Sequence, residues 1–120
     1  MRYQWMAALA VAGAMCVSAD AQQKRFEAQT GTAAYYSHVF EGRRTADHGH
    51  FHNSRMVAAS STIPLGTRVR VTNLKNNRSV VVKVVDLYSD KGRIIDLSKA
   101  AARKLGFTHA GTAQVKVEPV

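Results

Sequence analysis

The stretch TRVRVTNLKNNRSVVVKVVD, from Thr67 to Asp86, carries the strongest structural pattern in the sequence. Its first part, residues 67–72, alternates polar and apolar side chains with a period of two, as a half-buried strand does. Residues 79–85 are nearly continuous valine, and residues 73–77 between them hold two adjacent asparagines that favour a turn. The stretch therefore predicts a β-hairpin that feeds a closed core.

Shorter segments on both sides of this hairpin extend the pattern. Strands are expected at 32–36, 55–59, 94–97 and 112–117, and residues 37–54 have no period and predict a long loop. One short helix is expected at about 98–105, with Ser98 as its N-cap and Gly106 as its C-terminal glycine cap. Short, evenly spaced strands with a single helix indicate an all-β protein, folded as a small barrel that closes its own edges.

The first residues have the layout of a secretory signal peptide. Arg2 is followed by an apolar run over 6–17 and by Ala19-Asp20-Ala21, an A-x-A pattern that predicts cleavage after Ala21. The run is shorter than the about 20 residues that a membrane span needs, so we expect no stable membrane span. Cys16, the only cysteine, lies within this run, so the mature chain is expected to have no thiol.

We therefore divide the 120 residues into a signal peptide at 1–21, a flexible lead-in at 22–30 and a single domain at 31–120. The chain has 17 Lys and Arg against 8 Asp and Glu, a formal net charge of +9. Such a charge attracts polyanions, but the basic residues are dispersed and form no dense arm of the kind that binds nucleic acid. We interpret them as a solvated basic surface and expect a monomer without a nucleic-acid partner.

Several stretches resemble the rare lipoprotein A family, whose members are bacterial envelope proteins with a double-psi β-barrel. They are 31–36 (GTAAYY), 40–46 (FEGRRTA), 63–74 (IPLGTRVRVTNL), 92–102 (GRIIDLSKAAA) and 111–113 (GTA). They occur in the order of the family and nearly at its spacing, and together they cover most of residues 31–120. The resemblance implies a six-stranded double-psi β-barrel and an exported protein of the periplasm or cell envelope.

The resemblance also implies lytic cleavage of peptidoglycan glycan strands, with Asp86 in the position of the catalytic aspartate of the family. A carboxylate at the tip of an apolar strand is partly removed from water, which favours the neutral acid that must protonate a glycosidic oxygen. The same group can then help the 6-hydroxyl of the sugar attack the anomeric carbon. Because no water takes part, a second carboxylate is not obligatory.

Other positions are expected to contact the glycan. They are Tyr35, Tyr36, Arg43, Thr45 and Ser60. Ser60 stands where relatives have a histidine, and Tyr35 stands where they have a tryptophan. A tyrosine ring can stack on a sugar, although neighbouring strand residues point to opposite sides.

The glutamate that relatives usually carry in the long loop is replaced here by Gly49. Glu41 and Asp47 in the same loop are candidates to substitute for it, and His50 is a candidate acid–base partner. Asp96, next to the helix start at Ser98, is interpreted as structural, because a carboxylate there can accept backbone N–H bonds or hold a loop.

Three histidines, His48, His50 and His52, recur at every second position of the long loop. On an extended segment they would project from one side, an arrangement that can bind zinc or copper. No cysteine lies near them, so we interpret them as solvated loop residues and expect neither a metal nor another cofactor.

Three functions therefore compete. The leading hypothesis is a peptidoglycan lytic transglycosylase that uses Asp86. The second is a non-catalytic glycan-binding barrel of the expansin type, which the missing glutamate and histidine favour. The third is an envelope metal-binding protein that uses the histidine loop.

Overall fold

The expected hairpin is present and forms one wall of the core. The structure is a computed structural model that describes residues 26–87 and 92–120. Strand β3 (Arg68–Asn73) pairs antiparallel with β4 (Ser79–Asp86), and this register places Val69 opposite Val82. These two valines are completely or almost completely buried, whereas the alternate residues of β3 are exposed. The period-two pattern therefore gives the strand its inner and outer faces.

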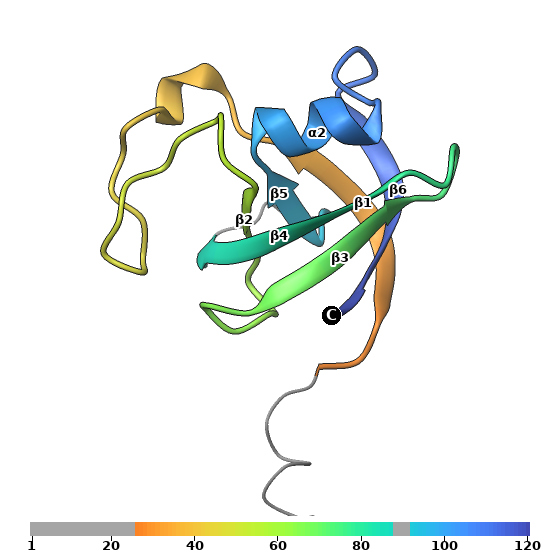
Figure 1. The fold of residues 1–120 in the computed structure, drawn as a ribbon, viewed down its shortest axis with the longest axis horizontal. Helices are drawn as coiled ribbons and strands as arrows, with labels where there is room; N and C mark the ends of the chain where they lie inside the picture. The colour runs from red at the N-terminus through yellow and green to blue at the C-terminus, as the bar shows by residue number, and fades with distance from the viewer. Residues whose placement is uncertain (1–25, 88–91) are drawn as a thin grey trace, which may run out of the picture.

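Six strands close into one barrel, as the family resemblance implied, and the structure gives their order as β1-β5-β2-β4-β3-β6 (Figure 1). The remaining strands are β1 (Gln29–Tyr35), β2 (Val57–Ala59), β5 (Ile95–Leu97) and β6 (Thr112–Pro119). The pairs β1–β5 and β2–β4 are parallel and the other four are antiparallel. Since every strand has a neighbour on both sides, the barrel has no open edge.

Several expected strand boundaries differ from the structure by one to three residues. Strand β1 begins at Gln29, inside the expected lead-in, because residues 29 and 30 pair with Val117 and Lys116 of β6. The strand expected at 55–59 is shorter and covers only 57–59. The expected signal peptide, with Cys16, and residues 22–25 lie outside the described residues.

The helix α2 (Lys99–Leu105) has the expected caps. The Ser98 side chain accepts a hydrogen bond from the Ala101 N–H at 3.2 Å, and Gly106 ends the helix with a φ of 81°. A positive φ there suits glycine, which lacks a Cβ. The helix packs against β4 and β1, with Ala101 and Leu105 fully buried. Among the described residues, no helix has the length and hydropathy needed to span a membrane.

The main core is built from aliphatic side chains of all six strands and of α2, together with Phe107. It comprises Ala33, Ala58, Ile63, Val69, Val71, Val80, Val82, Val84, Ile95, Leu97, Ala101, Ala102, Leu105, Phe107, Val115 and Val117. A second, small cluster of Tyr36, Phe51 and Ala59 fixes the long loop. This loop is not structureless, because it contains a 3-10 helix, η1 (His38–Phe40), and an isolated bridge between Arg44 and His50. Figure 1 shows the loop (gold to yellow-green) beside the end of β4.

Candidate active site

Asp86 is the last residue of β4, where the strand passes the long loop. Its Oδ1 accepts hydrogen bonds from two backbone N–H groups, that of Leu87 at 2.9 Å and that of Ala46 at 3.3 Å. Its Oδ2 accepts none from any residue that the structure describes. The carboxylate is therefore oriented through one oxygen, and the other is available for proton transfer.

A small cavity of about 120 Å³ opens beside this carboxylate. Its lining comes from the end of β1, the long loop and the end of β4, and consists of Tyr36, Phe40, Arg43, Arg44, Thr45, Phe51 and Asp86. Four of these residues, Tyr36, Arg43, Thr45 and Asp86, are among the site residues that the sequence predicted. The fold thus brings them together from positions up to 50 residues apart in the chain.

An aromatic cluster forms one wall of the cavity. The Tyr36 ring lies 4.2 Å from the Phe51 ring and 5.3 Å from the Phe40 ring, measured between centroids. Tyr36 is buried, but Phe40 is 36% exposed and the Arg43 guanidinium lies 5.4 Å from its ring centroid. The exposed ring of the wall is therefore Phe40, which the sequence analysis did not select. The sequence did hold one signal that could have identified Phe40 as a site residue, because it is a large apolar residue in a mainly polar loop.

Asp47 lies beside the cavity and holds one of its lining residues. Its Oδ1 accepts hydrogen bonds from the Thr45 hydroxyl at 2.5 Å and from the Gly49 N–H at 3.1 Å. The Thr45 hydrogen bond is the main reason that the pKa of Asp47 lies below its usual value. Asp47 is thus kept ionised, and its contacts orient Thr45 toward the cavity wall.

Glu41 is used elsewhere in the loop and does not line the cavity. Its two oxygens contact the Asn53 N–H at 2.8 Å and the His52 Nδ1 at 2.9 Å. The Asn53 N–H, followed by the His52 contact, holds the pKa of Glu41 below its usual value. Asn53 in turn accepts from the Lys99 and Ala100 N–H groups at the start of α2. Glu41 therefore fixes Asn53, which fastens the loop to the helix through a hydrogen bond with Lys99 that spans 46 residues and that no local pattern could reveal.

The loop histidines do not converge. His50 pairs with Arg44 through the backbone and is exposed, His48 is exposed with a φ of 74°, and His52 contacts Glu41. Among residues 26–87 and 92–120, no group of three or more His, Cys, Asp or Glu side chains could hold a metal ion.

Two residues that were expected to contact the glycan do not line the Asp86 cavity. Ser60 is completely buried, and its hydroxyl donates to the Ile94 carbonyl and accepts from the N–H groups of Thr62 and Ile63. It therefore stabilises a turn. The Tyr35 hydroxyl donates to the Thr108 carbonyl at 2.8 Å and its ring packs on Phe107, so Tyr35 faces away from the Asp86 cavity.

Asp96 has the surroundings of a structural residue. It is 3% exposed, and its Oδ1 lies 3.4 Å from the Arg93 Nε. Its backbone pairs with Ala59, which also pairs with Asp86 on the other side of β2. Asp96 does not line the cavity.

Sequence comparisons agree with this architecture. A family model described as "Lytic transglycolase" matches residues 28–117. Endolytic peptidoglycan transglycosylase RlpA of Neisseria meningitidis serogroup A is 48% identical over 93 residues, which are 77% of this chain and 39% of that protein. The RlpA of Pseudomonas aeruginosa strain UCBPP-PA14 is 50% identical over 93 residues, which are 75% of this chain and 27% of that protein. The chain thus spans less than half the length of these curated relatives.

Solved structures with the same fold are more distant in sequence. Streptomyces papain inhibitor superposes with a TM-score of 0.61 at 26% identity, covering 77% of this chain and 93% of that one. The Clavibacter michiganensis expansin in complex with cellohexaose superposes with a TM-score of 0.59 at 27% identity, covering 78% and 50%. The resemblance to the rare lipoprotein A family is confirmed, and the chain belongs to the lytic transglycolase family of double-psi β-barrel proteins.

Proposed function

We propose that the protein is a lytic transglycosylase that cleaves the glycan strands of peptidoglycan. The observation that carries this proposal is the Asp86 carboxylate, which lines the cavity with Oδ1 held by two N–H groups and Oδ2 available. The relatives named endolytic peptidoglycan transglycosylase support the same reaction class.

The reaction requires one group that gives a proton and then takes one. Asp86 Oδ2 protonates the glycosidic oxygen as the bond from that oxygen to the anomeric carbon breaks. The resulting carboxylate then accepts the proton of the 6-hydroxyl of the same sugar, whose oxygen forms the new bond to the anomeric carbon. The products are a strand with a 1,6-anhydro end and a strand with a free hydroxyl, and Asp86 ends protonated, as it began.

The wall of the cavity offers a surface on which a sugar ring can bind. The exposed Phe40 ring offers an apolar face to the C–H groups of a sugar, and Arg43 beside it offers N–H donors to hydroxyl or acetyl oxygens. Tyr36 supports the Phe40 ring from behind. A glycan strand lying across Phe40 and Arg43 would place a glycosidic oxygen near Asp86.

The second candidate is a glycan-binding barrel without catalysis. It is favoured by the engagement of Glu41 and Asp47 in loop hydrogen bonds, since Asp86 is then the one carboxylate among the described residues that line the cavity. A Clavibacter michiganensis expansin solved in complex with cellohexaose has a similar fold, which supports this candidate. In either case we infer that the protein is exported to the cell envelope, where its substrate lies, and acts as a monomer.

The test compares the purified protein with its Asp86→Asn variant on isolated peptidoglycan, with the products read by mass spectrometry. The amide keeps the size of the carboxylate but cannot donate and retake the proton, so anhydro products should fall by at least about 10²-fold. Pelleting with peptidoglycan should be unchanged. Glu118→Gln, on β6 and paired with Lys116, is the matched control and should keep full turnover.

Two results would contradict the proposal. Products with reducing ends would mean that water attacks. Retained pelleting without any product from the unmodified protein would leave the glycan binder as the function.

A further inference from the structure

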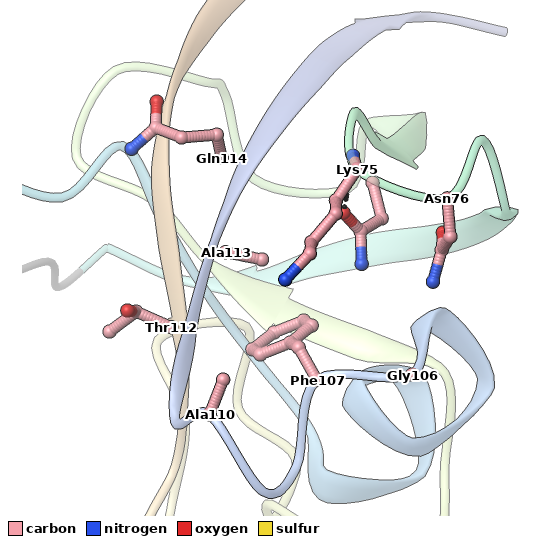
Figure 2. A pocket seen from close by; sticks show the side chains of 9 residues that line it. Lys75, Asn76, Gly106, Phe107, Ala110, Thr112, Ala113 and Gln114 are labelled. Atoms are coloured by element: carbon pink, nitrogen blue, oxygen red, sulfur yellow. Dashed lines mark hydrogen bonds between the residues drawn. The ribbon is translucent and has the colours of Figure 1, made fainter.

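A second and larger cavity, of about 590 Å³, lies at the opposite end of the barrel (Figure 2). The tip of the β3–β4 hairpin forms one side of it, and the segment between α2 and β6 forms the other. Strand β4 has eight residues and runs from this hairpin to Asp86, so at about 3.3 Å per residue the two cavities are about 23 Å apart. The volume is in the range of small-ligand sites, and the cavity is separate from the candidate active site.

The floor of this cavity is rigid and apolar. Phe107 is 3% exposed and packs edge-on against Tyr35, with 6.0 Å between ring centroids. The Tyr35 hydroxyl donates to the Thr108 carbonyl and so fixes the segment after α2. Ala110 and Ala113 add methyl groups to the wall. Tyr35 thus supports this second cavity.

Most polar groups around the cavity are already hydrogen-bonded. The Asn73 and Asn76 amides both donate to the Leu105 carbonyl, at 2.8 and 3.0 Å. The Gln114 amide donates to the Thr32 hydroxyl at 2.7 Å. The Lys75 ammonium, in contrast, makes no ion pair or hydrogen bond with any described residue, and Figure 2 shows it directed toward Phe107 and Ala113.

The charge around the cavity favours an anion. Residues 73–85 and 97–117 contain no Asp or Glu. They carry seven Lys and Arg residues, and Lys75 is the one of these that lines the cavity. The carbonyl end of α2 also faces this region and would repel an anion. That repulsion is reduced because the last carbonyl groups of α2 already accept hydrogen bonds. The Leu105 carbonyl accepts from the side-chain amides of Asn73 and Asn76. The carbonyls of residues 103 and 102 accept from the N–H groups of residues 106 and 107.

We propose that this cavity binds the free C-terminal carboxylate of a short peptide that ends in alanine, with Lys75 as the partner of the carboxylate. A single available cation suits a singly charged carboxylate, and the apolar wall suits alanine methyl groups. A neutral glycan would need many hydrogen-bond partners, which the occupied amides do not offer. The source of such a peptide rests on the proposed function, because the stem peptides of peptidoglycan end in D-alanine.

The test is a titration of the full, ¹⁵N-labelled protein with diacetyl-Lys-D-Ala-D-Ala, followed by amide chemical shifts. We expect the Lys75, Thr112 and Gln114 amides to shift. Lys75→Gln should weaken binding at least about tenfold, because a hydrogen bond to a charged group is lost, and a peptide amidated at its C-terminus should bind equally weakly. Arg103→Ala, an exposed cation of α2 outside the lining, is the matched control and should bind as the unmodified protein does.

Three results would overturn the proposal: equal binding of the amidated peptide, no shifts at millimolar peptide, or the same shifts with inorganic phosphate at equal concentration. Dispersed amide spectra of each variant show that it is folded. Asp86→Asn should bind the peptide normally, so loss of glycan cleavage and loss of peptide binding are separate outcomes.

Discussion

The Thr45–Asp47 pair offers the most direct test of how the loop supports the active site. Thr45→Val removes the hydroxyl but keeps the shape of the side chain, and Asp47→Asn removes the charge but keeps the size. The Thr45 hydroxyl donates a hydrogen bond to Asp47 Oδ1, and the same oxygen also accepts one from the Gly49 N–H. The amide oxygen of the Asp47→Asn variant can still accept from Thr45. The two changes, made singly and together, therefore form a double-mutant cycle that measures how far the charge of Asp47 strengthens this hydrogen bond.

The expected magnitude follows from the surroundings of the bond. A hydrogen bond to a charged group contributes about 1.5–3 kcal/mol to the free energy of unfolding. Thr45 is 8% exposed, but Asp47 is only partly buried, so water weakens the interaction. We therefore expect a coupling energy of about 1–2 kcal/mol at neutral pH.

The pH dependence has a defined sign. The folded-state pKa of Asp47 lies below its ordinary value of 3.8, mainly because of the Thr45 hydroxyl. The stabilisation is therefore present above pH 3.8 and is lost as the pH falls through the lower folded-state pKa. In Thr45→Val this pKa should rise toward 3.8, so the variant should lose less stability than the unmodified protein over the same acid range.

Urea unfolding followed by circular dichroism at pH 7 and at steps below pH 4 measures both quantities. A coupling energy indistinguishable from zero, together with identical acid profiles for Thr45→Val and the unmodified protein, would refute the reasoning. It would mean that Asp47 does not hold Thr45 in solution.

Two further predictions concern the barrel itself. Leu97→Ala should lower the free energy of unfolding by about 2–5 kcal/mol, because Leu97 is fully buried in the core, and chemical denaturation will measure the loss. Gly106→Ala should cost about 1–2 kcal/mol by the same assay, because Gly106 has a φ of 81° and a Cβ there would lie 3.0 Å from the side chains of Asn76 and Arg78. An unchanged midpoint for either variant would contradict the packing described here.

Local patterns predicted the elements of this fold well. The alternation over 67–72 and the valine run at 79–85 define β3 and β4, and Ser98 and Gly106 define the limits of α2. These signals are local, because side-chain periodicity and caps depend on neighbouring residues. The start of β1 was missed because it depends on pairing with β6, more than 80 residues away in sequence.

The sequence predicted some residues of the candidate active site and not others, again because local motifs are visible in a sequence and long-range packing is not. Tyr36, Arg43, Thr45 and Asp86 lie within or next to motifs shared with the family, and they meet at one cavity. The position matched by Ser60 holds a histidine in relatives, but a buried serine satisfies turn N–H groups instead. Whether a side chain faces a cavity or the core depends on strand orientation and loop packing, which a single sequence does not contain.

The loop also limits the chemistry that this active site can perform. The pKa values of both loop carboxylates are lowered, that of Asp47 mainly by the Thr45 hydroxyl and that of Glu41 mainly by the Asn53 N–H. Neither carboxylate is therefore suited to hold a proton during the reaction. A Cβ at Gly49, the position at which the family resemblance led us to expect a glutamate, would lie 3.3 Å from Asp47 Oδ1. The Asp47 carboxylate therefore lies where a side chain at position 49 would begin.

Among the described residues, Asp86 is then the one carboxylate of the cavity lining that could carry the proposed proton transfer. Hydrolysis with an attacking water commonly uses two carboxylates, one as acid and one as base or nucleophile. Attack by the 6-hydroxyl of the sugar needs one, because the same carboxylate gives the first proton and takes the second. The arrangement of Asp86, Asp47 and Glu41 therefore fits the proposed lytic cleavage, or binding without reaction, better than a hydrolysis in which Asp47 or Glu41 would be the second carboxylate.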